Sequence, residues 1–263
     1  MSRLVRKRDL PGYDENASVI PFVPWEIHID NLVWQPGEHT VAIGPTGKGK
    51  STLIKALLEY REKRDAHVLV IATKSANSFT ELTPDGVFRT KAQLDKHPRG
   101  YYLTRKWSKA NRGDYQRVVL WVRYSGKGSV AEQKKQSEAA LEDIMSQGGW
   151  TVYIDELRWF VDRMKLADWV TDLWTQAREI GVSAIGSTQR PVWVTRDIYA
   201  NSSHFYIWGT EDDEDLRRLS GIGGMENKVI RDAVAGLRGH DVLYIDAKRK
   251  RLYITRAPAP SKG

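Results

Sequence analysis

The stretch GPTGKGKST at residues 44–52 constrains this chain more than any other part of its sequence. It fits the pattern G-x-x-x-x-G-K-[ST], in which glycines let successive backbone N–H groups point at one anion. In such a loop Lys50 reaches the β- and γ-phosphates of a nucleoside triphosphate, and the Ser51 hydroxyl takes one position on Mg²⁺. We therefore expect the whole loop to hold the nucleotide, that is Gly44, Pro45, Thr46, Gly47, Lys48, Gly49, Lys50, Ser51 and Thr52.

The residues on either side of this loop have the character that phosphate binding requires. Residues 39–43 are a short apolar run typical of a buried strand, and residues 52–58 have helical character. The loop would then place the phosphates at a helix N-terminus, where unpaired N–H groups and the helix dipole stabilise an anion. A glycine- and lysine-rich surface turn would share the composition of the loop but would not need these flanks.

The composition of the chain limits its organisation and its surroundings. With 263 residues, of which 41% are hydrophobic, it can build a single domain, expected over residues 25–256. Residues 1–24 are basic and contain prolines, and residues 257–263 read APAPSKG, so we expect a flexible arm and a disordered tail. The absence of cysteine excludes disulfides and thiolate metal sites. No stretch approaches the ~20 apolar residues of a membrane span, so we expect a cytoplasmic protein that does not itself cross a membrane.

The positive charge is concentrated in residues 87–128. This segment holds eleven basic and two acidic residues, whereas the whole chain has a net charge of +8. Aromatic residues are interleaved with these charges, among them Tyr101, Tyr102, Trp107 and Tyr115. Cations neutralise phosphates and aromatic faces stack on bases, so we interpret the segment as insertion-like and as a candidate for nucleic-acid contact. A solvated surface loop is the alternative, and a basic turn at residues 248–251 is a second candidate for the contact.

Strand-like and helical segments alternate along the chain. Helices are predicted at residues 129–147, where Ser129 is the candidate cap, and at 159–164, 168–180, 212–219 and 226–235. Strands are predicted at residues 26–32, where polar and apolar residues alternate, and at 65–72, 118–122, 150–154, 182–186, 204–208, 241–245 and 251–255. This order predicts an α/β fold, with a mostly parallel sheet, helices on both faces and antiparallel additions at the edge.

Two adjacent carboxylates follow the predicted strand at residues 150–154. An aspartate in that place, Asp155, can hold Mg²⁺ opposite Ser51, and Glu156 can polarise a water for attack on the γ-phosphate. Adjacent carboxylates repel each other unless a cation is near, so a metal would explain the pair. An acidic strand end at the surface is the alternative. The pair nevertheless indicates hydrolysis, because phosphate binding alone is also typical of kinases and switches.

Gln189 and two arginines complete the candidate site. Gln189 follows the predicted strand at residues 182–186 and could hydrogen-bond the attacking water or the γ-phosphate. Arg178 lies near the end of a predicted helix, where it either complements the helix dipole or projects across a subunit boundary to a neighbour's phosphate. Arg190 is a rival for the second role.

The motifs occur in the order GPTGKGKST, TVYIDEL and QAREIGVSAIGSTQRP, which resembles the FtsK–HerA superfamily of DNA-pumping ATPases. The resemblance covers residues 41–208 and implies a P-loop NTPase fold of the RecA-like, ASCE type. It also implies a homo-oligomeric ring, pentameric or hexameric, with ATP at the subunit interfaces and double-stranded DNA in a basic pore. The roles that it implies are phosphate and metal binding for Lys50 and Ser51, Mg²⁺ binding for Asp155, water activation for Glu156, sensing for Gln189 and a trans-acting finger for Arg178.

The chain departs from this superfamily in two respects. After the second strand relatives often carry an acidic residue near a lysine, whereas this chain has Ala72-Thr73-Lys74. It also has no membrane segments or winged-helix domain like those of the large chromosome translocases. Its compact size is closer to that of the viral genome-packaging ATPases, which would act in the host cell cytoplasm.

The resulting hypothesis is an ATP-driven motor that packages viral DNA without reading its sequence. Such a motor would dock on a portal, a capsid or a membrane partner. A conjugative or chromosomal DNA pump has the same motifs, and a nucleotide-dependent switch would keep the loop without needing Glu156 or a trans arginine. A small-molecule or nucleotide kinase is a further alternative, but it explains neither Gln189 nor the basic segment.

Overall fold

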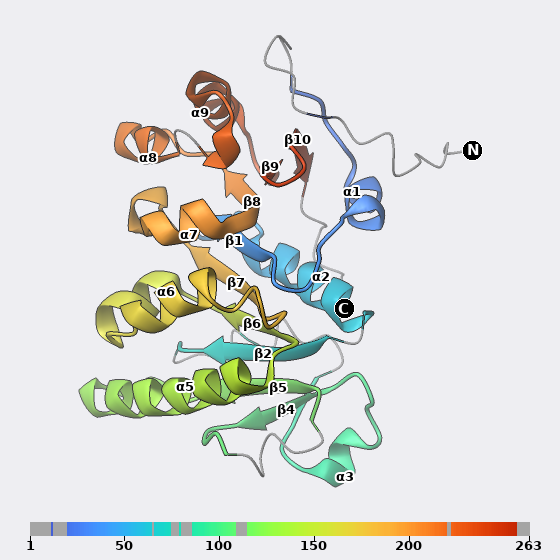
Figure 1. Cartoon of the computed structure of the whole chain (residues 1–263), viewed down its shortest axis with the longest axis vertical. Coiled ribbons are helices and arrows are strands. Elements are labelled where there is room, and N and C mark those ends of the chain that lie inside the picture. The colour runs from blue at the N-terminus through green and yellow to red at the C-terminus, as the bar shows by residue number, and fades with distance from the viewer. Residues whose placement is uncertain are drawn as a thin grey trace. The chain divides into compact units, whose positions relative to one another are not determined.

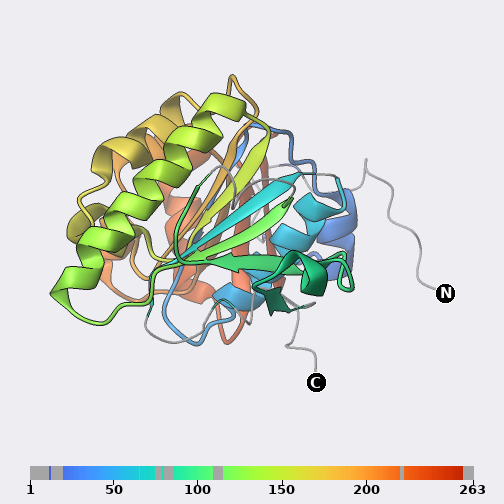
Figure 2. The same ribbon diagram turned by 90° about the horizontal axis from the view of Figure 1, so that it is seen from below.

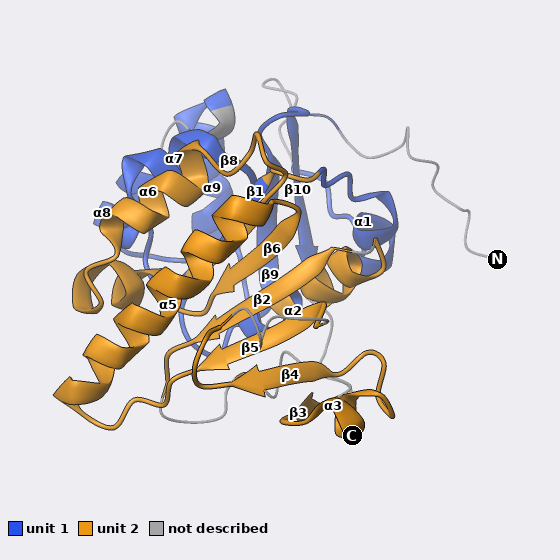
Figure 3. Cartoon of the chain, turned by 60° about the horizontal axis from the view of Figure 1, so that its bottom comes forward, with its two compact units in different colours: residues 1–35, 39–53, 188–263 blue, residues 36–38, 54–187 orange. Residues whose placement is uncertain are grey.

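The computed structural model describes residue 12 and residues 20–64, 66–74, 79, 86–108, 115–219 and 222–256. The chain divides into two compact units (Figure 3). Unit 1 comprises residues 1–35, 39–53 and 188–263, and unit 2 comprises residues 36–38 and 54–187. Most of the predicted arm and all of the predicted tail lie outside the described residues. The single domain over residues 25–256 stays a prediction.

The strands of unit 2 are all parallel. Their order is β7-β6-β2-β5-β4-β3, with Ile71 of β2 opposite Ile154 of β6 and Ile154 opposite Gly186 of β7. The middle strands are mostly apolar runs that are buried on both faces, as parallel strands require. The bounds are β2 (His67–Ala72), β3 (Val87–Phe88), β4 (Tyr101–Thr104), β5 (Arg117–Trp121), β6 (Trp150–Ile154) and β7 (Ser183–Thr188).

Helices cover both faces of the strands of unit 2. α5 (Lys127–Gln147) and α6 (Ala167–Thr175) lie on one face, and residues 54–62 of α2 (Lys50–Glu62) lie on the other (Figure 2). The shorter helices are α3 (Lys91–Leu94) and a π-helical turn, η2 (Trp159–Arg163). Ser129 is not the cap of α5, because that helix begins two residues earlier. The Ser129 hydroxyl instead donates to the Gly126 carbonyl oxygen at 2.7 Å, which steadies the first turn.

Unit 1 supplies the antiparallel strands. Its order is β10-β9-β8-β1, in which β1 and β8 are parallel while β8, β9 and β10 alternate in direction (Figure 1). Residues 21–23 run beside β10, with the Val23 N–H donating to the Ile254 carbonyl at 2.8 Å. The bounds are α1 (Trp25–Asn31), β1 (His39–Ile43), η3 (Pro191–Trp193), α7 (Arg196–Asn201), β8 (Ser202–Trp208), α8 (Asp213–Arg218), η4 (Ile222–Gly224), α9 (Asn227–Gly236), β9 (Asp241–Asp246) and β10 (Arg251–Arg256).

The predicted α/β class is therefore confirmed. The parallel strands lie between helices, and the antiparallel additions come from the C-terminal segment, as expected. Among the described residues, no helix is both long and apolar enough to cross a bilayer.

The strand predicted at residues 26–32 is wrong, because this segment is helix α1. Its buried residues are Trp25, His28 and Asn31, three apart, so one helical face points into the core. Polar–apolar alternation suggested a strand because His28 and Asn31 count as exposed residues in such a pattern. His28 is instead fully buried, with one ring nitrogen 2.8 Å from the Tyr253 hydroxyl and the other 2.9 Å from the Tyr206 hydroxyl.

Burial of His28 makes the stability of the protein depend on pH. Burial first, and then the nearby His204, lower the pKa of His28 from 6.5 to about 3, and the other groups packed around its ring are Tyr206, Tyr244 and Tyr253. Below pH 6.5 the unfolded chain binds a proton that the folded protein does not, so stability present above pH 6.5 is lost as the pH falls toward 3. At pH 5 the loss is about 2 kcal/mol.

Urea unfolding at pH 7.5 and pH 5.0 measures this loss. His28→Gln is expected to lose less of its free energy of unfolding between the two pH values than the wild type does. His97→Gln is the control, because the His97 side chain is exposed whereas that of His28 is buried. Equal losses in the wild type and in His28→Gln would contradict the assignment.

Candidate functional site

The phosphate-binding loop lies in unit 1, between the end of β1 and the start of α2. Gly47 and Gly49 have φ values of +81° and +96°, a left-handed backbone that glycine adopts without strain. Gly44 is required for a different reason, since a Cβ there would lie 2.6 Å from the Cβ of Trp208 on β8. Backbone conformation and close packing therefore explain why glycine occupies these three positions of the motif.

Lys50 and Ser51 stand at the first turn of α2, which follows the loop directly. The Lys50 ammonium donates to the carbonyl oxygens of Gly44 and of Pro45, the latter at 2.8 Å, so it lies against the loop. Ser51 is exposed on the same turn. The N-terminal N–H groups of a helix of this length have no partners within the helix, and they favour an anion.

A hollow of about 330 Å³ adjoins the loop within unit 1. Pro45 and Lys48 of the loop form one side, and residues 209–211 after β8 and 235–239 at the end of α9 form most of the rest. Its volume is at the lower end of the range for small-molecule sites. The hollow is large enough for the base and sugar of a nucleotide whose phosphates lie on the loop.

Gln189 is brought next to the loop, as the sequence predicted. The Gly44 N–H donates to the carbonyl oxygen of Thr188, the last residue of β7, at 3.1 Å. Gln189 is the next residue along the chain, and it is exposed. The first residue of the loop is thus hydrogen-bonded to the residue that precedes the candidate sensor.

Arg190 is bound to its own chain. Its guanidinium lies 2.9 Å from Asp212 and 3.0 Å from Asp215, at the N-terminal end of α8. The hydrogen bond to Asp215 is the main cause that raises the pKa of Arg190. These contacts tie Arg190 to its own chain, and they anchor the segment that follows Gln189.

The carboxylates lie in unit 2, where Asp155 directly follows β6. Its carboxylate accepts a hydrogen bond from the Tyr153 hydroxyl at 3.1 Å, and Lys74 Nζ lies 3.2 Å from Oδ2 and 3.3 Å from Oδ1. Burial, and next the nearby Asp155, raise the pKa of Tyr153 well above its usual value, so its hydroxyl stays protonated and donates. The Ser187 hydroxyl donates to the backbone carbonyl of Asp155. Glu156, the next residue, is less buried than Asp155.

These oxygen donors suit a hard divalent cation. The Asp155 carboxylate is largely buried and already attracts one cation, the Lys74 ammonium. Within the described parts of the chain, no group of three or more His, Cys, Asp or Glu side chains could hold a metal by itself. A metal at Asp155 would therefore need phosphate oxygens and water as further ligands, which is the usual way in which Mg²⁺ is held with a nucleotide.

Arg178 lies on a turn between α6 and β7, at the opposite edge of unit 2 from Asp155. The Gly149 N–H, just before β6, donates to the carbonyl oxygen of Ile180 on this turn at 3.0 Å. β6 then separates that edge from Asp155 by about 16 Å at ~3.3 Å per residue. The Arg178 side chain is exposed and makes no hydrogen bond or ion pair with the residues that the structure describes.

The backbone of this turn is closely packed. A Cβ at Gly37, whose φ is +80°, would lie 2.5 Å from the Arg178 carbonyl oxygen, and Gly181 closes the turn with a φ of +71°. The Gly181 N–H donates to the same carbonyl at 3.1 Å. A well-held backbone that carries an exposed arginine suits contact with another molecule better than contact with its own Asp155.

The basic segment at residues 87–128 is only partly as predicted. Tyr101 and Trp107 are buried, with the Tyr101 hydroxyl donating to Glu62, so the prediction that they could stack on bases is wrong for these two. Tyr102 and Tyr115 stack on each other with ring centres 4.0 Å apart. The described basic residues other than Arg117 remain exposed: Arg89, Lys91, Lys96, Arg99, Arg105, Lys106, Arg123 and Lys127.

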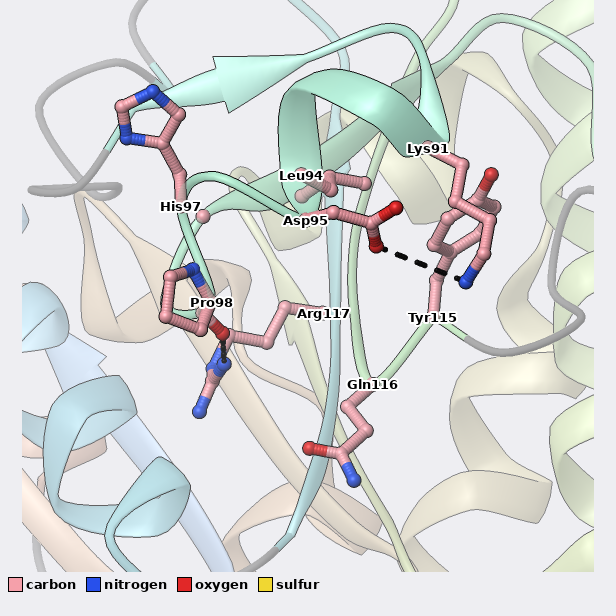
Figure 4. A pocket seen from close by; sticks show the side chains of 9 residues that line it. Lys91, Leu94, Asp95, His97, Pro98, Tyr115, Gln116 and Arg117 are labelled. Carbon is pink, nitrogen blue, oxygen red and sulfur yellow. Dashed lines mark hydrogen bonds and ion pairs between the residues drawn. The ribbon is translucent and has the colours of Figure 1, made fainter.

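A second hollow, of about 300 Å³, lies in this segment (Figure 4). Its cations have partners, since Lys91 lies 3.8 Å from Asp95 and Arg117 lies 3.3 Å from Glu62. Gly100 and Arg117 place it at the start of β4 and β5, whereas Asp155 follows the end of β6, a strand parallel to them. It is therefore not the place where Asp155 could take part in chemistry.

Sequence reasoning noticed Lys74 but gave it no role. The contact with Asp155 arises because β2 and β6 are parallel neighbours whose ends lie together, with the Asp155 N–H donating to the Ile71 carbonyl at 3.3 Å. A lysine just beyond one buried strand and an aspartate just beyond another were the signals that could have predicted the pair.

Comparison with known proteins bears on the fold. No protein-family model and no curated protein matches the sequence. The alignment with the genome packaging NTPase B204 of Sulfolobus turreted icosahedral virus 2 covers 86% of this chain and 99% of the B204 chain, with a TM-score of 0.62 and 17% identity. The chain has the fold of B204. The predicted P-loop NTPase fold is thereby confirmed.

Two further solved structures have the same fold. The alignment with VirB4 of Thermoanaerobacter pseudethanolicus covers 85% of this chain and 90% of the VirB4 chain, with a TM-score of 0.60 and 11% identity. The alignment with ATPases 2 and 3 of EssC from Geobacillus thermodenitrificans covers 88% of this chain and 41% of the EssC chain, with a TM-score of 0.53 and 14% identity. B204, a viral genome packaging NTPase, is of the kind that the motifs resemble.

Proposed function

We propose that the chain is a Mg²⁺-dependent ATPase that moves double-stranded DNA, as one subunit of a viral genome-packaging ring. The observation that carries the proposal is the phosphate-binding loop, whose Gly44 is packed against Trp208 and whose Lys50 lies against the loop at the start of α2. B204, which shares the fold, is a genome packaging NTPase whose structure has been determined with AMPPCP. A loop of this geometry suits a triphosphate.

The residues of the site have separate roles in this proposal. The loop and Lys50 bind the phosphates, Ser51 and Asp155 hold Mg²⁺, and the metal neutralises charge on the phosphates. Glu156 accepts a proton from the attacking water, Gln189 orients that water, and Arg178 acts on the nucleotide of a neighbouring subunit. The hollow beside Lys48 would take the base and sugar.

The exposed cations of the 87–128 segment and of the 248–251 turn are the proposed contacts to DNA. Such contacts would be to backbone phosphates and would not depend on base sequence. Docking on a portal, a capsid or a membrane partner, and action in the host cytoplasm, belong to the same proposal. A conjugative or chromosomal DNA pump would use the same chemistry on another DNA.

ATP hydrolysis measured with and without duplex DNA tests this function. We expect duplex DNA to raise the rate of phosphate release, and the rise to shrink as salt increases, because DNA binding releases counterions. Lys50→Ala should lower hydrolysis by about 10²- to 10³-fold, the usual effect of removing one charge-stabilising donor. Lys63→Ala is the control, because Lys63 is exposed in the turn after α2.

Two outcomes would count against the proposal. If Lys50→Ala kept both nucleotide affinity and turnover, the loop would not be the nucleotide site. Slow hydrolysis that duplex DNA does not change would favour the nucleotide-dependent switch. The mass of the assembled protein with AMPPCP bound would show whether it forms a ring.

A further inference from the structure

The Asp155 carboxylate requires a cation where it lies. Its side chain is 9% exposed, and the charged group nearest to it that the structure records is the Lys74 ammonium, 3.2 Å from Oδ2 and 3.3 Å from Oδ1. The contact with Oδ2 has the geometry of an ion pair rather than of a well-directed hydrogen bond. A carboxylate removed from water without a counter-charge is unfavourable, so Lys74 stabilises Asp155 in this arrangement.

The backbone that carries Lys74 is fixed by side chains of neighbouring elements. The Trp121 indole N–H donates to the Lys74 carbonyl oxygen at 2.9 Å, and the Gln133 amide donates to the Thr73 carbonyl oxygen at 2.8 Å. Gln133 is buried and is itself held by the Trp159 indole N–H at 3.0 Å. The lysine side chain therefore starts from a defined point beside the end of β6.

The ammonium group of Lys74 can move into water, whereas the Lys74 backbone is held in place by hydrogen bonds. The Lys74 side chain is 50% exposed, and its flexible stem can carry the charge into water without disturbing the core. The Lys74 ammonium lies near both oxygens of the Asp155 carboxylate, so a divalent cation on either oxygen would stand close to it and the two positive charges would repel each other. Binding of Mg²⁺ to Asp155 is thus weakened while Lys74 stays in place.

We propose that Lys74 is a built-in counter-ion that competes with the metal for Asp155 and so lowers the metal affinity of the site. The inference rests on the proposed role of Asp155 in holding Mg²⁺. Before the metal arrives, Lys74 pairs with the Asp155 carboxylate and holds it in position at the end of β6. When the metal binds, the released ammonium carries one positive charge away from the site into water.

Binding of Mn²⁺ to the full chain in the presence of AMPPCP, followed by the electron paramagnetic resonance of free Mn²⁺, tests this competition. Lys74→Gln removes the competing charge and should bind Mn²⁺ more tightly, on the order of tenfold, a typical coupling between two binding events. Lys74→Arg keeps the charge and should not bind Mn²⁺ more tightly than the wild type. Lys134→Gln is the control, because Lys134 forms an exposed ion pair with Glu138 at 3.8 Å.

Thermal unfolding with and without Mg²⁺ separates this role from a purely structural one. Without metal, Lys74→Gln should unfold at a lower temperature than the wild type, because Asp155 has lost its counter-charge. Mg²⁺ with AMPPCP should then raise the melting temperature of Lys74→Gln by more than that of the wild type. An equal drop with and without the metal would overturn the proposal, and so would weaker Mn²⁺ binding by Lys74→Gln.

Asp155→Asn distinguishes failure of this inference from failure of the proposed function. If Asp155→Asn binds Mn²⁺ as the wild type does, Asp155 does not hold the metal, and both the metal role and the competition are overturned. If Asp155→Asn loses Mn²⁺ binding while Lys74→Gln binds as the wild type, the metal role of Asp155 stands and the competition alone is overturned.

Discussion

ATP hydrolysis is expected to return when two inactive variants, Lys50→Ala and Arg178→Ala, are mixed and allowed to assemble together. Lys50→Ala subunits cannot hold the triphosphate but still present Arg178, whereas Arg178→Ala subunits hold the triphosphate but present no arginine. Each subunit of a ring has one neighbour on the side that supplies the arginine, so about a quarter of the sites in an equal random mixture carry both groups. Arg178→Ala alone should lower kcat by about 10³-fold or more, the range of an arginine supplied in trans.

The position of Arg178 is the physical reason for this expectation. It lies on a tightly held, exposed turn beside the start of β6, whereas Asp155 follows the end of the same strand. Arg178 therefore lies about the length of β6 away from the Asp155 of its own chain, and in the proposed ring the phosphate that it contacts would belong to another subunit.

Controls for the mixture follow from the same scheme. Lys50→Ala mixed with the double variant Lys50→Ala/Arg178→Ala has no intact phosphate site and should stay inactive. Phosphate release at a fixed total protein concentration is the measurement. If Arg178→Ala alone hydrolyses ATP at the wild-type rate, or if the complementing mixture stays inactive after its subunits have exchanged, Arg178 is not a trans-acting finger.

Glu156→Gln is expected to bind ATP with little change in affinity and to hydrolyse it about 10²- to 10⁴-fold more slowly, the usual contribution of a general base. Glutamine keeps the size and hydrogen-bonding capacity of the side chain but cannot accept a proton from water. A binding titration with AMPPCP and single-turnover hydrolysis of ATP measure the two effects separately.

The matched control for this variant is Glu142→Gln. Glu142 is an exposed glutamate on α5, in the same unit, and its replacement should change neither binding nor turnover. Wild-type hydrolysis by Glu156→Gln would remove the proposed base and favour the switch, which does not need one.

The parts of the fold that depend on local pattern were predictable. The apolar runs predicted at residues 39–43 and 150–154 are buried strands, and the run predicted at 65–72 contains the strand His67–Ala72, because short apolar runs of strand length fit a sheet covered on both faces. The loop was predictable because its glycines and lysine have fixed places relative to one another, and the position of Gln189 near the end of a strand was predictable because it comes shortly after the apolar run at residues 182–186.

Other features depend on partners far away in the sequence. Residues 26–32 form a helix because His28 has hydroxyl partners on β8 and β10, which no local pattern reveals. Tyr101 and Trp107 looked available to bases, but Glu62 accepts from Tyr101 and the Trp107 indole N–H donates to Asp143 at 3.1 Å. Polar partners of this kind let aromatic residues of a basic segment belong to the core.

The sequence by itself determined the chemistry that this chain can offer: a phosphate loop, two carboxylates, a glutamine and two arginines in a recognisable order. Only the tertiary structure shows how those arginines differ, because the acidic end of α8 binds Arg190 while Arg178 stays exposed. It also paired Lys74 with Asp155, 81 residues apart in the chain. Spacing along a chain limits which groups a short loop can bring together, whereas contacts between strand ends depend on the order of strands in the sheet, which spacing does not contain.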